Sequence, residues 1–240
     1  MKNCPRGIRA IGFDLGETLL TYRDTPLSWV SLYRSALKSV AQSCSCSPVD
    51  AQFLAAEAVL VQHNTRLNPR TEEIPAEEIF RRILDAWQLS PEVLAVAIEA
   101  FFCFFQQRLV AYDETFLTLT SLREQGFKIG VLTDVPYGMP RAFVQRDLID
   151  GGIAPLIDQL LTSVDTGFRK PEPHGFNALT KSLGVSPAEI LYIGNEPKDV
   201  IGANAADIFS VLIDRENRDP AHGQRATIHS LSDIIPALIP

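Results

Sequence analysis

The stretch AIGFDLGETLL, residues 10–20, decides the fold, because an apolar run there ends abruptly in a carboxylate. Residues 10–13 predict a buried strand, which Asp14 and Gly16 follow directly. Removing a carboxylate from water is costly unless it is paired with a cation or binds a metal. Asp14 therefore predicts a partner at the end of this strand, and Gly16 allows the chain to turn there.

Further apolar runs predict the remaining strands of a sheet. They cover residues 128–133, 157–163, 189–194 and 208–213. Most of these runs are almost continuously apolar, which is typical of parallel strands covered on both faces. Helical patterns lie between and after them, at about 113–125, 172–184, 198–206 and 231–238. This alternation indicates an α/β fold with a doubly wound parallel sheet.

A long insert separates the first predicted strand from the second by more than one hundred residues. A simple crossover connection is far shorter. Ser47-Pro48 and Ser90-Pro91 are helix start signals within this insert. The predicted helices cover about 26–43, 48–64, 75–88 and 91–108. We therefore predict a core domain formed by residues 1–20 and 110–240, with a helical domain of residues 21–109 inserted into it.

A cluster of phenylalanines marks the last helix of the insert. Its members are Phe101, Phe102, Phe104 and Phe105. Aromatic stripes usually pack inward, which favours a place in the interior of a helix bundle. A pocket lid or a dimer face is the alternative.

The net charge of −7 bears on the class of ligand. A chain with this charge has no bulk electrostatic attraction for nucleic acid or for an anionic membrane surface. A phosphate-bearing ligand must then be held by local groups or by a metal.

The apolar segments and the cysteines indicate the setting in which the chain folds. Residues 93–105 contain Glu99 and fall short of the roughly 20 residues that span a bilayer. The apolar run near the N-terminus is too short for a signal peptide. Cys44 and Cys46 have no matching pair and no nearby His, so reduced thiols are favoured over a zinc site. We expect a soluble cytoplasmic protein, and either a monomer or a homodimer.

Polar side chains follow the ends of the predicted strands, which is where open α/β sheets bind their ligands. The residues that stand there, or in the loops just beyond, are Asp14, Thr133, Asp134, Arg169, Lys170, Asn195, Glu196, Lys198 and Asp199. They predict a site in which carboxylates, a hydroxyl and ammonium groups converge on one edge of the sheet.

Four motifs in this order resemble those of the haloacid dehalogenase-like (HAD) hydrolase superfamily. They are FDLGETL around Asp14, GVLTD around Thr133, FRKPEP around Lys170 and IGNEPKDVIGANAAD around Asn195 and Asp199. The resemblance covers essentially the whole chain. It implies a Rossmann-like α/β core, with the helical insert as the cap domain of the family.

The resemblance also implies nucleophilic phosphoryl chemistry. Asp14 would attack phosphorus and form an aspartyl-phosphate. Thr133 would donate a hydrogen bond to a phosphoryl oxygen, while Lys170 would neutralise developing charge and hold Asp14 ionised. The implied Mg²⁺ ligands are Asp14, the Gly16 carbonyl, Asn195 and Asp199. The residues implied to bind the substrate or its phosphate are Glu17, Thr18, Asp134 and Arg169.

Two positions depart from the motifs of the family. Gly16 stands where its phosphatases carry a second Asp that protonates the leaving group, a contribution worth about 10²–10⁴ in rate. Glu17, Asp134 or Glu196 could supply the acid instead. Asn195 stands where the family has an Asp, which predicts weaker Mg²⁺ affinity.

Three functions stay open on these grounds. The first is a Mg²⁺-dependent phosphatase for a small phosphorylated metabolite. The second is a catalytically silent binding or regulatory protein. The third is a dehalogenase-type hydrolase, whose attack on carbon needs no metal, although the dehalogenases of the family usually carry a Tyr in place of Gly16. None of the three implies nucleic acid or a membrane as a partner.

Overall fold

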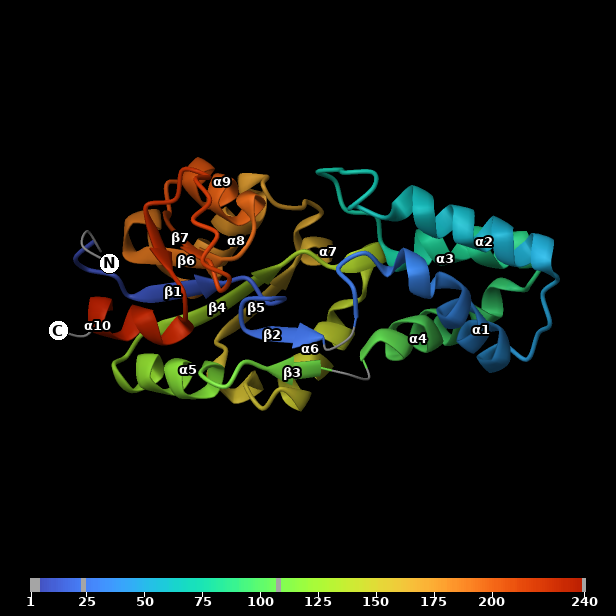
Figure 1. The fold of residues 1–240 in the computed structure, drawn as a ribbon, viewed down its shortest axis with the longest axis horizontal. Helices are drawn as coiled ribbons and strands as arrows, with labels where there is room; N and C mark the ends of the chain where they lie inside the picture. The colour runs from blue at the N-terminus through green and yellow to red at the C-terminus, as the bar shows by residue number, and fades with distance from the viewer. Residues whose placement is uncertain (1–4, 23–24, 107–108, 239–240) are drawn as a thin grey trace.

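A six-stranded parallel sheet forms the centre of the protein in the computed structural model, which describes residues 5–22, 25–106 and 109–238 (Figure 1). Its strand order is β5-β4-β1-β6-β7-β8, and all neighbouring strands are parallel. The strands are β1 (Ala10–Phe13), β4 (Lys128–Thr133), β5 (Gln159–Thr162), β6 (Ile190–Gly194), β7 (Phe209–Ile213) and β8 (Ala226–Ile228). The predicted doubly wound α/β fold is confirmed.

The strand β1 lies in the middle of the sheet, and all four of its residues are buried. Phe13, its last residue, is in register with Val131 of β4 on one side and with Ile193 of β6 on the other. The three central strands therefore end at the same edge of the sheet. The loop that begins at Asp14 emerges between its two neighbours there.

Helices cover both faces of this sheet (Figure 1). α8 (Pro173–Leu183) and α9 (Pro197–Ala205) lie on one face, and α5 (Thr115–Glu124) and α10 (Ile235–Leu238) lie on the other. Gly130 allows α8 to approach β4 closely, because a Cβ at that position would lie 2.7 Å from Leu179 Cδ1. This two-sided cover explains why the strands read as continuous apolar runs.

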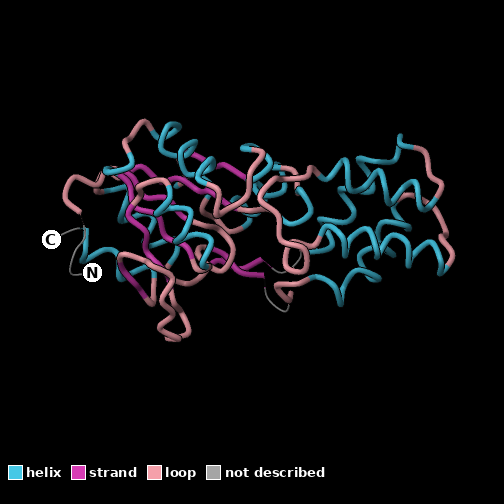
Figure 2. Tube along the Cα trace, turned by 90° about the horizontal axis from the view of Figure 1, so that it is seen from above, coloured by secondary structure: helices cyan, strands magenta, loops and turns pink. Residues whose placement is uncertain are grey.

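Four helices lie together beyond one end of the sheet, on the right in both Figure 1 and Figure 2. They are α1 (Tyr33–Ser43), α2 (Asp50–His63), α3 (Ala76–Trp87) and α4 (Leu94–Phe105). α1 packs on α4, and α2 packs on α3. Within residues 25–106, no segment contributes a strand to the six-stranded sheet. That these helices form a separate domain, with boundaries at residues 21 and 109, stays a prediction.

The phenylalanine cluster lies inside this helical bundle. Phe101 and Phe102 are fully buried, and Phe105 is nearly so. Phe80 of α3 packs edge-to-face against Phe101, with ring centroids 5.1 Å apart. The predicted place of the cluster in the interior of the bundle is confirmed, with Phe104 only partly buried.

A two-stranded antiparallel ribbon lies between the sheet and the helical bundle (Figure 1). β2 (Leu20–Tyr22) pairs with β3 (Leu109–Ala111). The sequence does not predict this ribbon, because three residues are too few to display an alternating pattern.

Several predicted helix boundaries are wrong by a few residues. The first insert helix is predicted from residue 26, but a 3-10 turn, Trp29–Leu32, precedes α1. Another 3-10 turn, Pro91–Val93, precedes α4, and the predicted helical residues 107–108 lie outside the described residues. The predicted helix 231–238 consists of a 3-10 turn, Leu231–Ile234, followed by α10.

Besides the ribbon of β2 and β3, two α-helices and one strand of the main sheet are absent from the prediction. They are α6 (Arg141–Asp150), α7 (Ser163–Thr166) and β8. The buried face of α6 includes Asp147 beside apolar side chains, and this charged residue interrupts the apolar stripe by which a helix is recognised. α7 has four residues and β8 has three, so neither provides a readable period.

The membrane and cysteine predictions can be compared with the same residues. None of the helices in the described ranges combines the length and the apolar character needed to span a bilayer. Cys44, Cys46 and Cys103 are free thiols, as predicted. Cys4 lies outside the described residues.

Candidate active site

Asp14 lies at the end of β1 and is only 6% exposed. Its backbone N–H donates to the Ile193 carbonyl at 2.8 Å, and its Oδ1 accepts a hydrogen bond from Lys170 Nζ at 2.7 Å. Burial raises the pKa of Asp14 to about 6, although the charge of Lys170 acts to lower it. The partner that the sequence predicts for Asp14 is therefore present, and it is Lys170.

Lys170 lies between two carboxylates. Its Nζ is 2.5 Å from Asp199 Oδ1 and also donates to the Tyr192 hydroxyl at 3.2 Å. Burial lowers the pKa of Lys170, but the charges of Asp14 and Asp199 outweigh burial and raise it well above its usual value. The ammonium group is thus held charged beside Asp14.

Two oxygen acceptors, Asp14 Oδ2 and the Gly16 carbonyl, lie beside the Asn195 amide on the other side of Asp14. The amide group of Asn195 lies 3.3 Å from both Asp14 Oδ2 and the Gly16 carbonyl oxygen. If the Asn195 amide oxygen faces these two oxygens, three hydrogen-bond acceptors meet without a donor. If the amide nitrogen faces them, it donates a hydrogen bond to each. Mg²⁺ takes oxygen ligands of these kinds, usually one or two carboxylates together with several waters. The donor set therefore fits Mg²⁺.

Asp199 has protein partners on both carboxylate oxygens. Oδ1 contacts Lys170, and Oδ2 accepts a hydrogen bond from the Glu196 backbone N–H at 2.9 Å. In the described ranges no three His, Cys, Asp or Glu side chains converge as a metal-binding group. The candidate cation site hence combines one carboxylate, Asp14, with a carbonyl and an amide group. A direct metal contact by Asp199 stays a prediction.

The turn after Asp14 places its left-handed residue at Glu17, whose φ is 58°, rather than at Gly16. The Glu17 carboxylate accepts hydrogen bonds from the Thr21 hydroxyl at 2.7 Å and the Tyr112 hydroxyl at 2.8 Å. These two bonds hold Glu17 in a conformation that glycine adopts more readily. A Cβ added at Gly16 would meet no atom within 4 Å. Gly16 therefore does not adopt the positive φ that glycine permits.

Thr18 is fully buried and does not line the pocket at this site. Its hydroxyl lies 3.4 Å from Asn195 Oδ1, and its carbonyl accepts a hydrogen bond from Arg215 Nη2 at 2.8 Å. Thr18 is thus placed to support Asn195. Its predicted contact with phosphate stays a prediction.

Thr133 and Asp134 stand at the end of β4, and both line the pocket. Asp134 Oδ1 accepts a hydrogen bond from the Lys170 backbone N–H at 3.0 Å, and Oδ2 lies 3.2 Å from Lys198 Nζ. Burial raises the pKa of Asp134, but the nearby cations, Lys198 foremost, outweigh burial and hold it below its usual value. Asp134 therefore acts as a fixed carboxylate that orients the Lys170 loop.

Arg169 is buried and forms an ion pair with Glu73, which belongs to the loop between α2 and α3. Glu73 also accepts a hydrogen bond from the Ser163 hydroxyl at 2.6 Å. The guanidinium of Arg169 donates to the Val135 carbonyl at 2.8 Å and lies 3.8 Å from Asp134. Although Arg169 lines the pocket, its charge is committed to this contact between helices and core.

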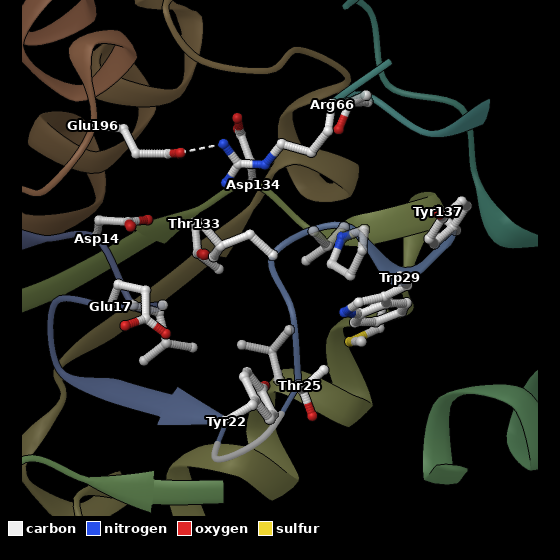
Figure 3. A pocket seen from close by; sticks show the side chains of 18 of the residues that line it. Asp14, Glu17, Tyr22, Thr25, Trp29, Arg66, Thr133, Asp134, Tyr137 and Glu196 are labelled. Atoms are coloured by element: carbon white, nitrogen blue, oxygen red, sulfur yellow. Dashed lines mark hydrogen bonds and ion pairs between the residues drawn. The ribbon is translucent and has the colours of Figure 1, made fainter. Parts of the chain in front are cut away.

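A pocket of about 190 Å³ opens between the strand ends and the helical bundle (Figure 3). Asp14 and Thr133 lie at one end of it, and Trp29 and Tyr137 lie at the other. Its apolar lining residues are Leu15, Pro26, Leu27, Trp29, Val135, Pro136, Tyr137, Met139 and Val144. Arg66 reaches from the α2–α3 loop and pairs with Glu196 (Figure 3).

The sequence alone does not reveal Arg66, Trp29 or Tyr137 as pocket residues. No motif marks them, and Arg66 and Tyr137 come from segments that are remote in the chain from Asp14. The helical insert itself offers an indication, because the loops of an insert that covers the sheet edge are expected to face the site.

Proteins of known family match most of this chain. A family model for haloacid dehalogenase-like hydrolases matches residues 8–207. A glyceraldehyde 3-phosphate phosphatase of Methanopyrus kandleri is 29% identical over 210 residues, which are 87% of this chain and 84% of the relative. A phosphoserine phosphatase of Thermus thermophilus is 31% identical, covering 75% and 73%. (S)-2-haloacid dehalogenase 1 of a Pseudomonas species is 27% identical, covering 65% and 73%.

A solved structure agrees with the same fold. The crystal structure of a HAD phosphatase from Thermococcus onnurineus superposes with a TM-score of 0.67 at 21% identity, over 97% of this chain and 98% of that chain. At this level of identity the likeness concerns the fold.

Proposed function

Because the chain belongs to the haloacid dehalogenase-like hydrolase family, we propose that it is a Mg²⁺-dependent phosphatase for a small phosphorylated metabolite. One observation carries the proposal: a buried carboxylate, Asp14, stands at the floor of a pocket with Lys170 on one oxygen and with the Gly16 carbonyl and the Asn195 amide beside the other. Two of the relatives are phosphatases by name, which supports the same reaction.

The reaction would proceed in two displacements. A carboxylate oxygen of Asp14 attacks phosphorus and forms an aspartyl-phosphate, and water then releases inorganic phosphate and restores Asp14. Lys170 holds Asp14 ionised and stabilises negative charge that develops in the transition state. Thr133 donates a hydrogen bond to a phosphoryl oxygen. Asp199 acts as a positioning residue through its contact with Lys170.

Asp14, the Gly16 carbonyl and Asn195 would hold the Mg²⁺ ion. When bound, the ion offsets the repulsion between an anionic nucleophile and an anionic phosphate. Since Asn195 contributes no charge, we expect weaker Mg²⁺ binding than with an Asp at this position.

The acid that protonates the leaving group is the open part of this mechanism. Of the candidates, Asp134 and Glu196 are held ionised, because nearby cations outweigh burial and lower the pKa of each. Glu17 accepts two hydroxyl hydrogen bonds. Each of these three side chains is therefore placed to accept hydrogen bonds, which favours a substrate with a good leaving group.

A dehalogenase is the second candidate, and Asn195 favours it. Attack of Asp14 on carbon requires no metal, so replacing a metal-binding carboxylate by an amide would cost such an enzyme little. One relative is a haloacid dehalogenase by name. A catalytically silent binding protein is the remaining alternative.

A metal-dependence assay separates these functions. We expect purified protein to hydrolyse 4-nitrophenyl phosphate with Mg²⁺ and to lose this activity when EDTA removes the metal. Chloride release from 2-chloropropionate that persists in EDTA would instead identify a dehalogenase. If neither substrate reacts, the silent binding protein is favoured.

Two further parts of the proposal rest on sequence reasoning. A cytoplasmic location follows from the reduced thiols that composition predicts, and a monomer or homodimer is the expected state. Size-exclusion chromatography with light scattering measures the second directly.

A further inference from the structure

The far end of the pocket offers an apolar surface to the part of a substrate that carries no phosphate. Trp29 and Tyr137 lie there, and Met139 and Val144 line the same cavity (Figure 3). The Trp29 ring stacks on Phe105, with centroids 3.7 Å apart and planes 9° apart, so the bundle holds it in place. Such a wall favours a flat, apolar group over a polar one.

Within the described residues, each Arg and Lys side chain that lines this pocket already has a carboxylate partner. Arg66 pairs with Glu196, and Arg169 pairs with Glu73. Lys198 lies 2.8 Å from Glu196 Oε2 and 3.2 Å from Asp134 Oδ2. A substrate with a second anionic group would have to displace a protein carboxylate or face one without compensation. The lining therefore favours an uncharged organic group.

The carboxylates of the pocket are likewise occupied as acceptors. Glu17 accepts hydrogen bonds from two hydroxyls. Asp147 accepts hydrogen bonds from Gln106 Nε2 at 2.7 Å and from the Tyr22 hydroxyl. Glu196 and Asp134 are ion-paired. A leaving oxygen thus finds these carboxylate oxygens already engaged with protein partners, and its own basicity decides how readily it leaves.

Basicity of the leaving oxygen distinguishes two classes of ester. A phenol has a pKa of about 10, as the tyrosine side chain does, whereas an alcohol lies near the value of about 15.7 for water. Unassisted departure is therefore far easier for a phenolate than for an alkoxide.

We propose that the substrate is an aryl phosphate monoester whose aromatic group is uncharged and lies against Trp29. This inference rests on the proposed phosphatase function and names its substrate class. Three separate observations point to it: the aromatic wall, the paired cations and the occupied carboxylates.

The atoms of the reaction balance without a protein acid. A carboxylate oxygen of Asp14 bonds to phosphorus as the bond between phosphorus and the aryl oxygen breaks. The electron pair leaves on the aryl oxygen, which takes a proton from water. A second water then attacks phosphorus, which frees Asp14 and yields inorganic phosphate and a phenol.

Three substrates test the proposal on the wild-type protein with Mg²⁺: phenyl phosphate, benzyl phosphate and phosphoglycolate. Benzyl phosphate keeps the ring but leaves as an alkoxide, and phosphoglycolate carries a second anion. We expect kcat/KM for phenyl phosphate to exceed that for benzyl phosphate by at least about 10²-fold, the size of a missing general acid. Phosphoglycolate should be poorer than phenyl phosphate as well.

The outcomes separate this inference from the proposed function. Equal rates for phenyl and benzyl phosphate, or a preference for phosphoglycolate, would overturn the substrate class while the phosphatase function stands. No turnover of any of the three would overturn the phosphatase function itself, and the substrate class with it.

A variant series tests the role of Trp29. Trp29→Ala should lower kcat/KM for phenyl phosphate about tenfold, mainly through a higher KM, and Trp29→Phe should restore most of it. Phe116→Ala is the matched control, because Phe116 is 52% exposed on α5 and lies outside the pocket. If Trp29→Ala does not fold, Leu27→Ala replaces it, because Leu27 lines the pocket and is 64% exposed. An unchanged KM in the folded variant would contradict the proposal.

Arg66 provides the competing explanation, because its side chain is 43% exposed and could turn from Glu196 to a substrate anion. In that case Arg66→Gln would lower kcat/KM for phosphoglycolate much more than for phenyl phosphate. We expect the ratio of the two values to stay the same, and a tenfold fall in this ratio would overturn the proposal.

Discussion

The two ends of the pocket are built from opposite kinds of interaction. At the strand ends, Asp14, Lys170 and Asp199 are at most 6% exposed and hold one another by charge. At the far end, Trp29 and Tyr137 are placed by packing among aromatic rings. The difference teaches that phosphate chemistry and selection of the organic group have separate physical origins, so each can be changed without the other.

Asp14→Asn should break the charged end completely. The substitution keeps the shape but removes the attacking carboxylate, and loss of a nucleophile typically costs at least about 10⁴-fold in kcat. Phosphatase assays of the purified variant measure this loss. Asp150→Asn, on the exposed end of α6, is the control and should keep its activity. Full activity in Asp14→Asn would refute the mechanism.

Lys170→Ala should damage both activity and stability. Two buried carboxylates would lose their shared cation, and breaking such a pair costs about 3–5 kcal/mol. We expect kcat to fall about 10²–10³-fold, as when one group that stabilises transition-state charge is removed.

The stability of Lys170→Ala should depend on pH in a defined direction. Without the cation, burial and the neighbouring carboxylate act on Asp14 unopposed by Lys170, so its pKa in the folded state lies still further above its unfolded value. Asp14 is neutral in both states well below pH 4, so the variant is least destabilised there and loses stability as pH rises through the folded pKa of Asp14. Urea denaturation at pH 5 and pH 8 measures this, and an equal loss at both would contradict the pairing.

Gly16→Asp should improve the cleavage of alkyl esters selectively. A Cβ at this position meets no atom within 4 Å, and Gly16 does not have a positive φ, so the substitution is compatible with the backbone. A general acid there would raise the rate for benzyl phosphate by up to about 10²-fold, while phenyl phosphate gains little. Gly16→Asn has a similar shape without the acid and serves as the control. Equal gains in both variants would argue against acid catalysis.

The acidic limb of the pH–rate profile should reflect Asp14. Burial raises the pKa of Asp14 to about 6, and the protonated carboxyl cannot attack phosphorus. At limiting Mg²⁺, kcat/KM should therefore fall about tenfold per pH unit below pH 6. Saturating Mg²⁺ should move this limb to lower pH, because a cation favours the charged form. If the pH of this limb does not change with Mg²⁺ concentration, the titrating group is not Asp14.

The smallest effect is expected at the exposed ion pair between helices and core. Arg66 is 43% exposed, so Arg66→Gln should change the free energy of unfolding by less than about 1 kcal/mol. Glu73→Gln is the matched comparison, because the Glu73 and Arg169 side chains are at most 6% exposed. It should cost at least about 2 kcal/mol, since a buried charge loses its partner. Similar losses in both variants would contradict this distinction.

Much of the sheet and of its charged edge is predictable from the sequence. Strands covered on both faces appear as apolar runs, and β1, β4, β6 and β7 agree with such runs within one or two residues. That Asp14 needs a partner is predictable because a buried carboxylate requires compensation, and the family motif around Lys170, which follows β5 in the same sheet, indicates which residue it is. The edge of a parallel sheet brings these residues together irrespective of loop detail.

Other features depend on contacts that no local pattern encodes. Arg169 reads as a phosphate ligand, but the tertiary structure pairs it with Glu73, which is far away in the chain. Gly16 is expected to let the chain turn, but the residue with a positive φ in this turn is Glu17, whose carboxylate Thr21 and Tyr112 hold. The sequence does not predict α6, because the buried face of this helix carries the charged Asp147. The hydrogen-bond donor to this carboxylate is Gln106 at the end of α4, which is distant in the chain.

The sequence by itself determined the fold class, the helical character of the long insert and the need for a partner at Asp14, because periodicity and the cost of burying charge act within short segments or at strand ends. The resemblance to the HAD motifs added Lys170 as that partner. Only the tertiary structure decided the shape and polarity of the far end of the pocket. Trp29 and Tyr137 meet there with ring centroids 5.6 Å apart, although they lie far apart in the chain. Their contact comes from the packing of the bundle against the core, which depends on many weak apolar contacts at once and leaves no periodic mark in the sequence.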